Sequence, residues 1–222
     1  MNVLITGANR GLGLGFAKHY LQRGDEVWAC YRSDSGELSG LASNKLHLLQ
    51  WDVRQLLDNN AGLPDSINLL INNAGIYGPG KDGQSLEKIS PEIMRQVFEV
   101  DCIGPLNAVQ ALKSRIVHAA GTIANLSSKM GSTTDNSSGG TYAYRAAKAA
   151  LVIVSKSMAV DLAPFGVRVI TLHPGWVKTE MTGQTGLVDV ETSVNGMANV
   201  IANVNDYGSG SFIAFDGRKV PF

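Results

Sequence analysis

The residue types and spacing that most clearly suggest catalysis are a tyrosine and a lysine, Tyr144 and Lys148, which precede the apolar stretch 149–163. On a helix, residues four apart lie on one face, one turn apart. An ammonium group beside a phenol favours the phenolate, so Lys148 is expected to lower the pKa of Tyr144. Such a phenol can protonate a carbonyl oxygen as hydride reaches the carbonyl carbon, and can recover the proton in reverse. The pair alone decides little, because Tyr-x-x-x-Lys occurs by chance on many helices.

A glycine-rich segment near the start of the chain indicates a nucleotide site. The expected strand 3–6 leads into Gly7, Gly11 and Gly13, and a helical pattern follows. Glycines at these positions let the backbone turn tightly and approach a pyrophosphate, which then lies at the positive end of the helix. The spacing is G-x-x-x-G-x-G, and a tight turn without a ligand is the alternative interpretation.

The end of the second expected strand indicates which dinucleotide binds. An acidic residue there bonds the ribose 2′-hydroxyl of NAD, whereas an arginine accommodates the 2′-phosphate of NADP. Here Tyr31 occupies the place of the acid and Arg32 follows, while Arg10 supplies a second cation from the glycine loop. Two arginines and no acid predict NADP(H) in preference to NAD(H). Asp34 could instead pair with Arg32.

Short apolar runs alternate with longer helical patterns along the whole chain. This alternation predicts an α/β fold, a doubly wound parallel sheet with helices on both faces. No repeat or linker divides the chain, so one domain over residues 1–222 is expected. Strands are predicted over 3–6, 26–31, 46–51, 67–72, 121–126 and 167–172, and helices over 12–23, 91–119, 142–163 and 190–204.

Composition excludes several classes of function. Lys+Arg and Asp+Glu are 19 each, so no basic field attracts nucleic acid or an anionic membrane surface. The two cysteines, Cys30 and Cys102, are far apart and the four histidines are scattered, so neither a disulfide framework nor a metal site is expected. The first residues already read as a strand and no apolar run reaches 18 residues, which predicts a cytoplasmic protein without a targeting or membrane segment.

Five motifs occur in a recognisable order. They are Thr6-Gly7-x-x-x-Gly11-x-Gly13, Asn72-Asn73-Ala74-Gly75, Ser127-Ser128, Tyr144-x-x-x-Lys148 and Pro174-Gly175. In order and spacing they resemble the short-chain dehydrogenase/reductase family, over nearly the whole chain. The segments 175–181 and 210–222 resemble its C-factor and sniffer-type carbonyl reductase branch. The resemblance implies a Rossmann-type sheet of about seven strands.

The resemblance also implies the chemical roles. Tyr144 matches the acid and base of the family, and Lys148 the residue that lowers its pKa and holds the nicotinamide ribose. Ser128 matches the residue that hydrogen-bonds the substrate oxygen, where developing negative charge needs a donor. The polar loop 131–140 lies between Ser128 and Tyr144 and is expected to shape the substrate entrance.

Cofactor contacts carry over in the same way. Asp52 matches a contact to adenine, and 73–75 the turn beneath the adenine ribose. Pro174-Gly175 matches the cover of the nicotinamide, Thr179 the bond to its carboxamide, and 180–189 a mobile lid. The complete predicted set is Thr6, Gly7, Asn9, Arg10, Gly11, Leu12, Gly13, Arg32, Asp52, Val53, Asn73, Ala74, Gly75, Tyr144, Lys148, Pro174, Gly175, Val177 and Thr179.

One position departs from the family. The helix predicted from Pro91 usually carries an asparagine whose backbone carbonyl holds a water in a proton relay to the lysine, and here that residue is Asp101. The carbonyl survives the exchange, so Asp101 is either a relay residue or a structural one. A carboxylate near Lys148 could also pair with it and disturb the pKa of Tyr144.

Together these features predict an NADP(H)-dependent oxidoreductase that transfers hydride between nicotinamide and a small carbonyl or alcohol substrate. The alternative is a cofactor-bound signalling or redox-sensing protein with little turnover, which need not keep Ser128, Tyr144 and Lys148 together. The resemblance implies a homodimer or homotetramer built on the helices 91–119 and 142–163. No nucleic acid, metal or membrane partner is expected.

Overall fold

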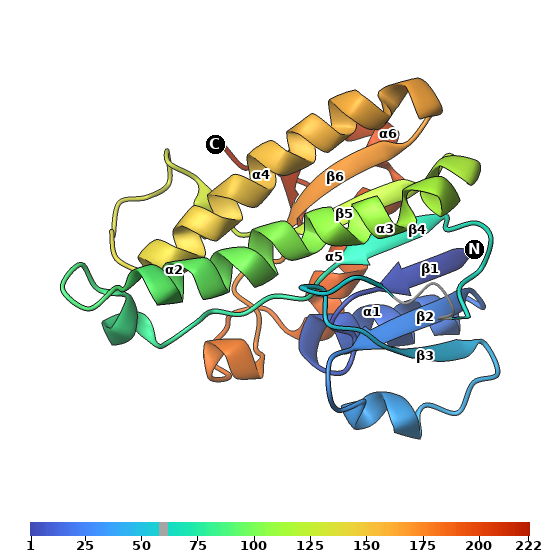
Figure 1. Cartoon of the computed structure of the whole chain (residues 1–222), viewed down its shortest axis with the longest axis horizontal. Coiled ribbons are helices and arrows are strands. Elements are labelled where there is room, and N and C mark those ends of the chain that lie inside the picture. The colour runs from blue at the N-terminus through green and yellow to red at the C-terminus, as the bar shows by residue number, and fades with distance from the viewer. Residues whose placement is uncertain (58–61) are drawn as a thin grey trace.

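Seven parallel strands form the sheet at the centre of the computed structural model, which describes residues 1–57 and 62–222. Their order is β3-β2-β1-β4-β5-β6-β7, and each pairing between neighbours is parallel. The chain starts in the middle of the sheet, builds one half, and crosses back at β4 to build the other (Figure 1). The strands are β1 (Asn2–Ile5), β2 (Glu26–Tyr31), β3 (Leu46–Gln50), β4 (Leu69–Asn72), β5 (Thr122–Leu126), β6 (Arg168–His173) and β7 (Ser211–Ala214).

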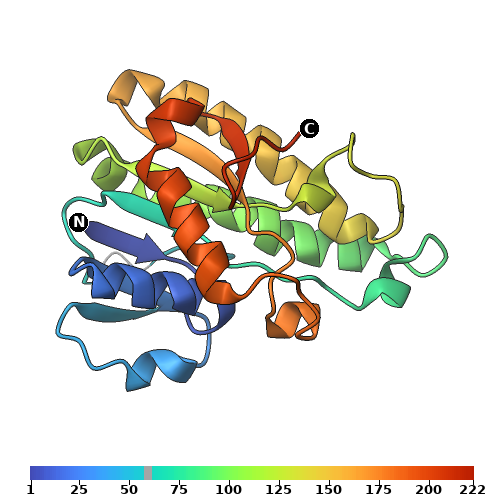
Figure 2. The ribbon, with the colours of Figure 1, turned by 180° about the vertical axis from the view of Figure 1, so that it is seen from behind.

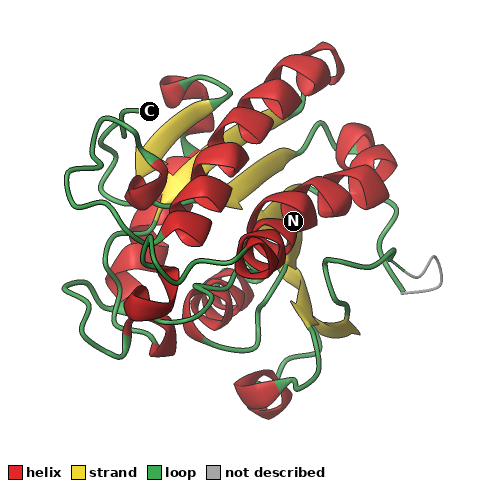
Figure 3. Ribbon diagram, turned by 60° about the vertical axis from the view of Figure 1, so that its left-hand side comes forward, coloured by secondary structure: helices red, strands yellow, loops and turns green. Residues whose placement is uncertain are grey.

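Helices cover both faces of the sheet. The face toward the viewer in Figure 1 carries α2 (Pro91–Phe98), α3 (Gly104–His118) and α4 (Tyr142–Leu162). The opposite face, seen in Figure 2, carries α1 (Gly11–Gln22) and α5 (Val190–Ala202), and α6 (Val204–Tyr207) follows α5. In Figure 3 the strands lie between these helices. The predicted doubly wound α/β fold is therefore confirmed.

Alternation of side chains along each strand gives the two faces separate apolar cores. Val3 and Ile5 are buried in the core shared with α1 and α5, where Phe16 packs. Leu4, between them, is buried in the core shared with α3 and α4, where Leu112 packs. Because both faces are covered, the strands read in the sequence as continuous apolar runs.

The long helix predicted over 91–119 is interrupted, and that prediction was wrong in this respect. A π-helical turn, η3 (Glu99–Ile103), separates α2 from α3, and the N–H of Gly104 bonds the carbonyl of Glu99. Pro105 explains the break, because it has no N–H to donate to the carbonyl of Asp101 and its ring would clash with that carbonyl in an α-helix. The wider turn carries the chain past the proline and leaves Asp101 facing inward, fully buried.

The other predicted elements agree with the structure to within two residues at each end. The seventh strand, β7, lies in the segment 210–222, where a family resemblance was noted but no strand limits were predicted. Among the described residues, none of the helices combines the length and apolarity that crossing a membrane requires.

Candidate active site

The predicted site residues gather where the strands end. In a parallel sheet all carboxyl ends share one edge, and ligands bind there at the point where the strand order reverses, which here is between β1 and β4. Residues 6–13 follow β1, 73–75 follow β4, Ser128 follows β5 and 174–179 follow β6. Arg32, Asp52 and Val53 follow β2 and β3 at the same edge.

Hydrogen bonds between two strand ends hold the glycine loop. The Thr6 hydroxyl oxygen accepts from the N–H groups of Asn73 and Ala74, both at 3.1 Å. The Asn73 side-chain amide donates to the carbonyl of Gly7 at 2.8 Å. A Cβ at Gly13 would lie 2.2 Å from that same carbonyl oxygen, so only glycine fits. The side chain of Asn73 therefore holds the glycine loop in place.

The start of α1 suits an anion. In the described chain Arg10, at the N-cap, makes no side-chain capping bond, and the first turn holds no acidic residue. The first N–H groups of the helix are therefore free to donate, at the positive end of the helix dipole. Gly7 and Gly11 both adopt positive φ, which brings the backbone rather than side chains to the surface of the loop. The residues present fit the pyrophosphate of a dinucleotide.

Tyr144 and Lys148 lie together on α4, as their spacing predicted. Tyr144 is 9% exposed and Lys148 5%, and the Lys148 ammonium lies 5.6 Å from the centre of the Tyr144 ring. Ser128, also buried, stands where β5 ends, and its side chain is near enough to Tyr144 to favour the phenolate and lower the pKa of the phenol. The structure therefore brings all three residues to one place.

Asp101 faces Lys148 from the π-helical turn. Asp101 Oδ2 lies 3.1 Å from Lys148 Nζ, and Asp101 Oδ1 accepts from the N–H of Ile76 at 2.8 Å. Lys148 Nζ also donates to the carbonyl of Leu126 at 3.0 Å. Burial raises the pKa of Asp101, while Lys148 opposes that rise. Burial alone would lower the pKa of Lys148, but the carboxylate of Asp101 holds it above its usual value.

The pKa of Tyr144 differs from the sequence expectation. Burial raises it, Lys148 lowers it, and the charge of Asp101 raises it again. The direction expected of the lysine is right, but the net pKa lies above the ordinary value of a tyrosine. The sequence could show the Tyr144–Lys148 spacing, but it could not show the desolvation of the phenol.

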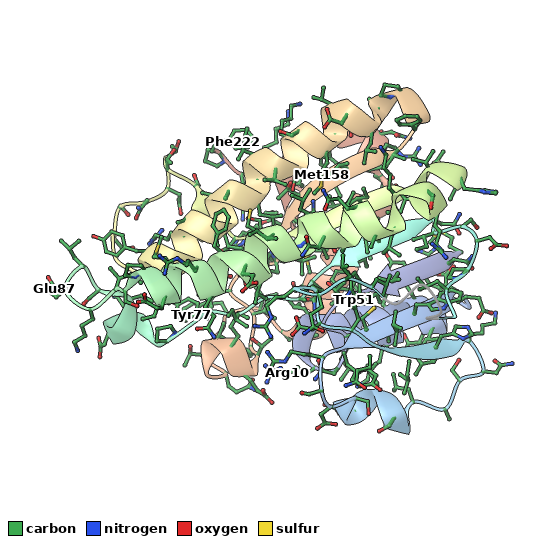
Figure 4. All side chains as sticks on the ribbon, in the orientation of Figure 1. Arg10, Trp51, Tyr77, Glu87, Met158 and Phe222 are labelled. Carbon is green, nitrogen blue, oxygen red and sulfur yellow. The ribbon has the colours of Figure 1, made fainter. Side chains whose placement is uncertain are left out.

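The two arginines predicted to select NADP lie in different settings. Arg32 is exposed just beyond β2, and in the described residues Asp34 does not pair with it but accepts from the N–H of Gly36. Arg10 pairs with Glu180 at 2.6 Å, with both side chains 68% exposed. Figure 4 shows Arg10 between the start of α1 and the turn η6 (Glu180–Thr182).

The remaining predicted cofactor residues are placed as follows. Asp52 is held by Arg54 through a two-point ion pair, a contact that was not predicted. Val53 and Val177 are buried. The side chain of Thr179 lies 3.6 Å from where a Cβ on Gly11 would be, so the segment after β6 approaches the glycine loop.

Two residues near Tyr144, Tyr77 and Gln84, were not predicted from the sequence. The ring of Tyr77 lies 4.9 Å from that of Tyr144, centre to centre, and the side chain of Gln84 bonds the backbone of Tyr144. Their contacts join parts of the chain about 60 residues apart, and no local pattern in a single sequence marks them.

Comparison with known proteins agrees with this arrangement. The sequence profile described as short chain dehydrogenase matches residues 1–187. The C-signal protein of Myxococcus xanthus is 38% identical over 157 residues, covering 70% of this chain and 93% of that protein. The carbonyl reductase Sniffer of D. melanogaster superposes with a TM-score of 0.92 at 31% identity, covering 100% of this chain and 99% of that one. The NADPH-bound carbonyl reductase from chicken fatty liver superposes with a TM-score of 0.88, also at 31% identity, covering 100% and 98%.

Proposed function

Since this chain belongs to the short-chain dehydrogenase family and is an NAD(P)-dependent oxidoreductase, we propose that it transfers hydride between NADP(H) and a small carbonyl or alcohol substrate, with Tyr144 as acid and base. The resemblance drawn from the motifs, to the C-factor and sniffer type, is confirmed. The observation that carries the proposal is the meeting of Ser128, Tyr144 and Lys148 at the sheet edge that also carries the glycine loop.

Each residue has a distinct part in the proposed reaction. The bound nicotinamide supplies the hydride chemistry. The Ser128 hydroxyl donates a hydrogen bond to the substrate oxygen, which gains negative charge as the carbonyl is reduced. Tyr144 gives its phenolic proton to that oxygen, and takes it back when an alcohol is oxidised. The ammonium of Lys148 stabilises the phenolate that remains.

Asp101 adds a charge to this group. Its carboxylate raises the pKa of Lys148 and so keeps the ammonium protonated. The same negative charge disfavours the phenolate and raises the pKa of Tyr144. We therefore assign Asp101 to the proton-handling group. The proposed relay water would bind its backbone carbonyl, which receives no hydrogen bond from Pro105.

NADP(H) is proposed over NAD(H) because of Arg32 and Arg10. Arg32 follows β2 and has an exposed side chain, at the position where a 2′-phosphate is accommodated. Arg10 lies in the glycine loop. Its ion pair with Glu180 must open before its guanidinium can bind that phosphate. The chicken relative with bound NADPH supports this choice.

The signalling alternative has less support. A binding protein has no need of a serine, a tyrosine and a lysine assembled in a buried cluster, and this chain has all three.

The predicted homodimer or homotetramer stays a proposal. It is supported by exposed apolar side chains on the outer helices, among them Phe98, Ile153 and Val160. A sizing measurement that finds only monomer would overturn it.

The function is tested by titrating the protein with NADPH and NADH, then measuring turnover on a panel of ketones, aldehydes and quinones. We expect tighter binding of NADPH, turnover of at least one carbonyl, and loss of that turnover in Tyr144→Phe with cofactor binding retained. Tight binding without turnover on any substrate would favour the signalling alternative. Tighter binding of NADH would refute the roles given to Arg10 and Arg32.

A further inference from the structure

The helix that carries Tyr144 lacks a cap of its own. The N-cap residue Thr141 has left-handed backbone angles, φ 52° and ψ 43°, and among the described residues its side chain caps nothing. A β-branched residue rarely adopts this conformation, which is strained. The first N–H groups of α4 have no partner within the helix, and those of Ala143 and Tyr144 belong to buried residues. A buried N–H without an acceptor is costly, so a partner from elsewhere is expected.

Gln84 supplies that partner from about 60 residues upstream. It ends the short turn η2 (Lys81–Gln84) and is fully buried. Its Oε1 accepts from the N–H of Tyr144 at 3.1 Å, while its Nε2 donates to the carbonyls of Tyr77 at 2.7 Å and Pro79 at 2.9 Å. The three contacts fix the orientation of the amide, because a flipped amide would set its NH₂ against an N–H and its oxygen against two carbonyls.

The same segment also contacts the Tyr144 ring. The Tyr77 ring (labelled in Figure 4) lies 4.9 Å from it, at an interplanar angle of 48°. The Tyr77 hydroxyl lies 3.4 Å from that of Thr141. At its start the segment is held by Asp101, which accepts from the N–H of Ile76. Residues 76–84 are therefore tied at one end to the charge beside Lys148 and at the other to the backbone of Tyr144.

We propose that Gln84 is a positioning residue for Tyr144: it caps α4 from outside the helix and fixes where the phenol lies relative to Ser128 and Lys148. The proposal rests on the proposed function, since it assumes that Tyr144 handles the proton. Without the cap, the first turn of α4 is free to fray. Small displacements of a reacting group lower the rate of the chemical step far more than they weaken cofactor binding.

Two substitutions separate positioning from simple destabilisation. Gln84→Met keeps length and volume but removes all three hydrogen bonds, so kcat should fall about 10- to 100-fold, while the KM for NADPH stays within about twofold. Gln84→Glu keeps an acceptor for the N–H of Tyr144. Its protonated carboxyl can donate to one of the two carbonyls, and its ionised form can donate to neither. The introduced carboxyl should therefore add a new ionisation to the pH profile of kcat, with higher activity at pH values where it is protonated.

Ser90→Ala is the matched control. Ser90 caps α2 through the N–H of Ile93 at 3.3 Å, so its loss removes the cap of a helix that packs beside α4 but leaves the bond between Gln84 and Tyr144 in place. The control should lower the melting temperature without changing kcat or its pH profile. If Gln84→Met does not fold, the pH profile of Gln84→Glu decides. Unchanged kcat in folded Gln84→Met, an unchanged profile in Gln84→Glu, or an equal loss of kcat in Ser90→Ala would each overturn the role of Gln84. Absence of turnover in the unmodified protein would overturn the proposed function as well.

Discussion

Replacing Asp101 by asparagine tests how buried charge sets the acidity of Tyr144. The exchange keeps the shape of the side chain and an acceptor for the N–H of Ile76, and it removes the negative charge that faces Lys148. Burial contributes most to the raised pKa of Tyr144, and the charge of Asp101 adds to it. Removing that charge should therefore lower the pKa of the phenol.

The size of the shift follows from the geometry. Lys148 Nζ lies 3.1 Å from the Asp101 carboxylate and 5.6 Å from the centre of the Tyr144 ring, so the carboxylate lies within about 9 Å of the ring. At an effective dielectric constant of ~20, two unit charges at that distance interact by about 2 kcal/mol. One pKa unit corresponds to about 1.4 kcal/mol, so Asp101→Asn should lower the apparent pKa of Tyr144 by roughly one unit.

The assay is the pH dependence of both reaction directions. Reduction needs the protonated phenol, so its rate is constant below the pKa of Tyr144 and falls above it. Oxidation needs the phenolate, so its rate rises with pH up to that pKa. In Asp101→Asn both transitions should move about one unit toward lower pH. At a pH below both transitions, oxidation should be about tenfold faster and reduction unchanged.

Asp25→Asn provides the control. Asp25 is also a buried carboxylate, paired with the N-terminal ammonium at 2.8 Å, but it lies at the opposite end of β1 from the site. Its loss should lower the thermal stability without moving either transition. Asp101→Asn should also be less stable, because it leaves Lys148 without its buried partner, at a cost of up to about 3–5 kcal/mol. Transitions that stay in place, or that move to higher pH, in a folded Asp101→Asn variant would refute the reasoning.

Three further predictions concern the cofactor side. Gly13→Ala should abolish NADPH binding in a titration, because its Cβ would lie 2.2 Å from a backbone oxygen, whereas Gly40→Ala, with nothing within 4 Å, should bind normally. Glu180→Gln frees Arg10 and should tighten NADPH binding by at most about fivefold, an effect that shrinks in high salt; weaker binding would contradict the competition inferred here. Arg32→Ala should weaken NADPH at least tenfold and NADH by less than twofold, following loss of about 1.5 kcal/mol or more from a charge-assisted bond; equal losses would contradict its role.

Much of the fold could be predicted because both faces of the sheet are covered. A strand buried on both sides must be apolar throughout, and the runs around Leu4, Leu70 and Ile123 show that signature.

The π-helical turn was not predicted, although the sequence contains a signal for it. Pro105 stands inside an otherwise helical pattern, and a proline there removes one helical hydrogen bond.

In the site, the spacing of Tyr144 and Lys148 and the order of the motifs predicted which residues meet. Three properties could not be predicted, and each depends on tertiary structure. The net pKa of Tyr144 depends on burial, the pairing of Arg10 with Glu180 spans 170 positions, and the cap from Gln84 spans 60. A single sequence records side chains and their local spacing, but it does not record which distant groups become neighbours.

The π-helical turn also has a consequence for chain length. An i→i−5 turn holds one residue more than an α-helical turn. If one residue between Phe98 and Gly104 were deleted, the remaining chain would have the length of a single unbroken α-helix from α2 through α3. In that helix α3 would keep its face toward the sheet and α2 its face toward α4, and the residue facing Lys148 would change. Deletion of one residue can thus remove the buried charge without any substitution at that site, and Pro105 opposes that deletion because it cannot lie inside the unbroken helix.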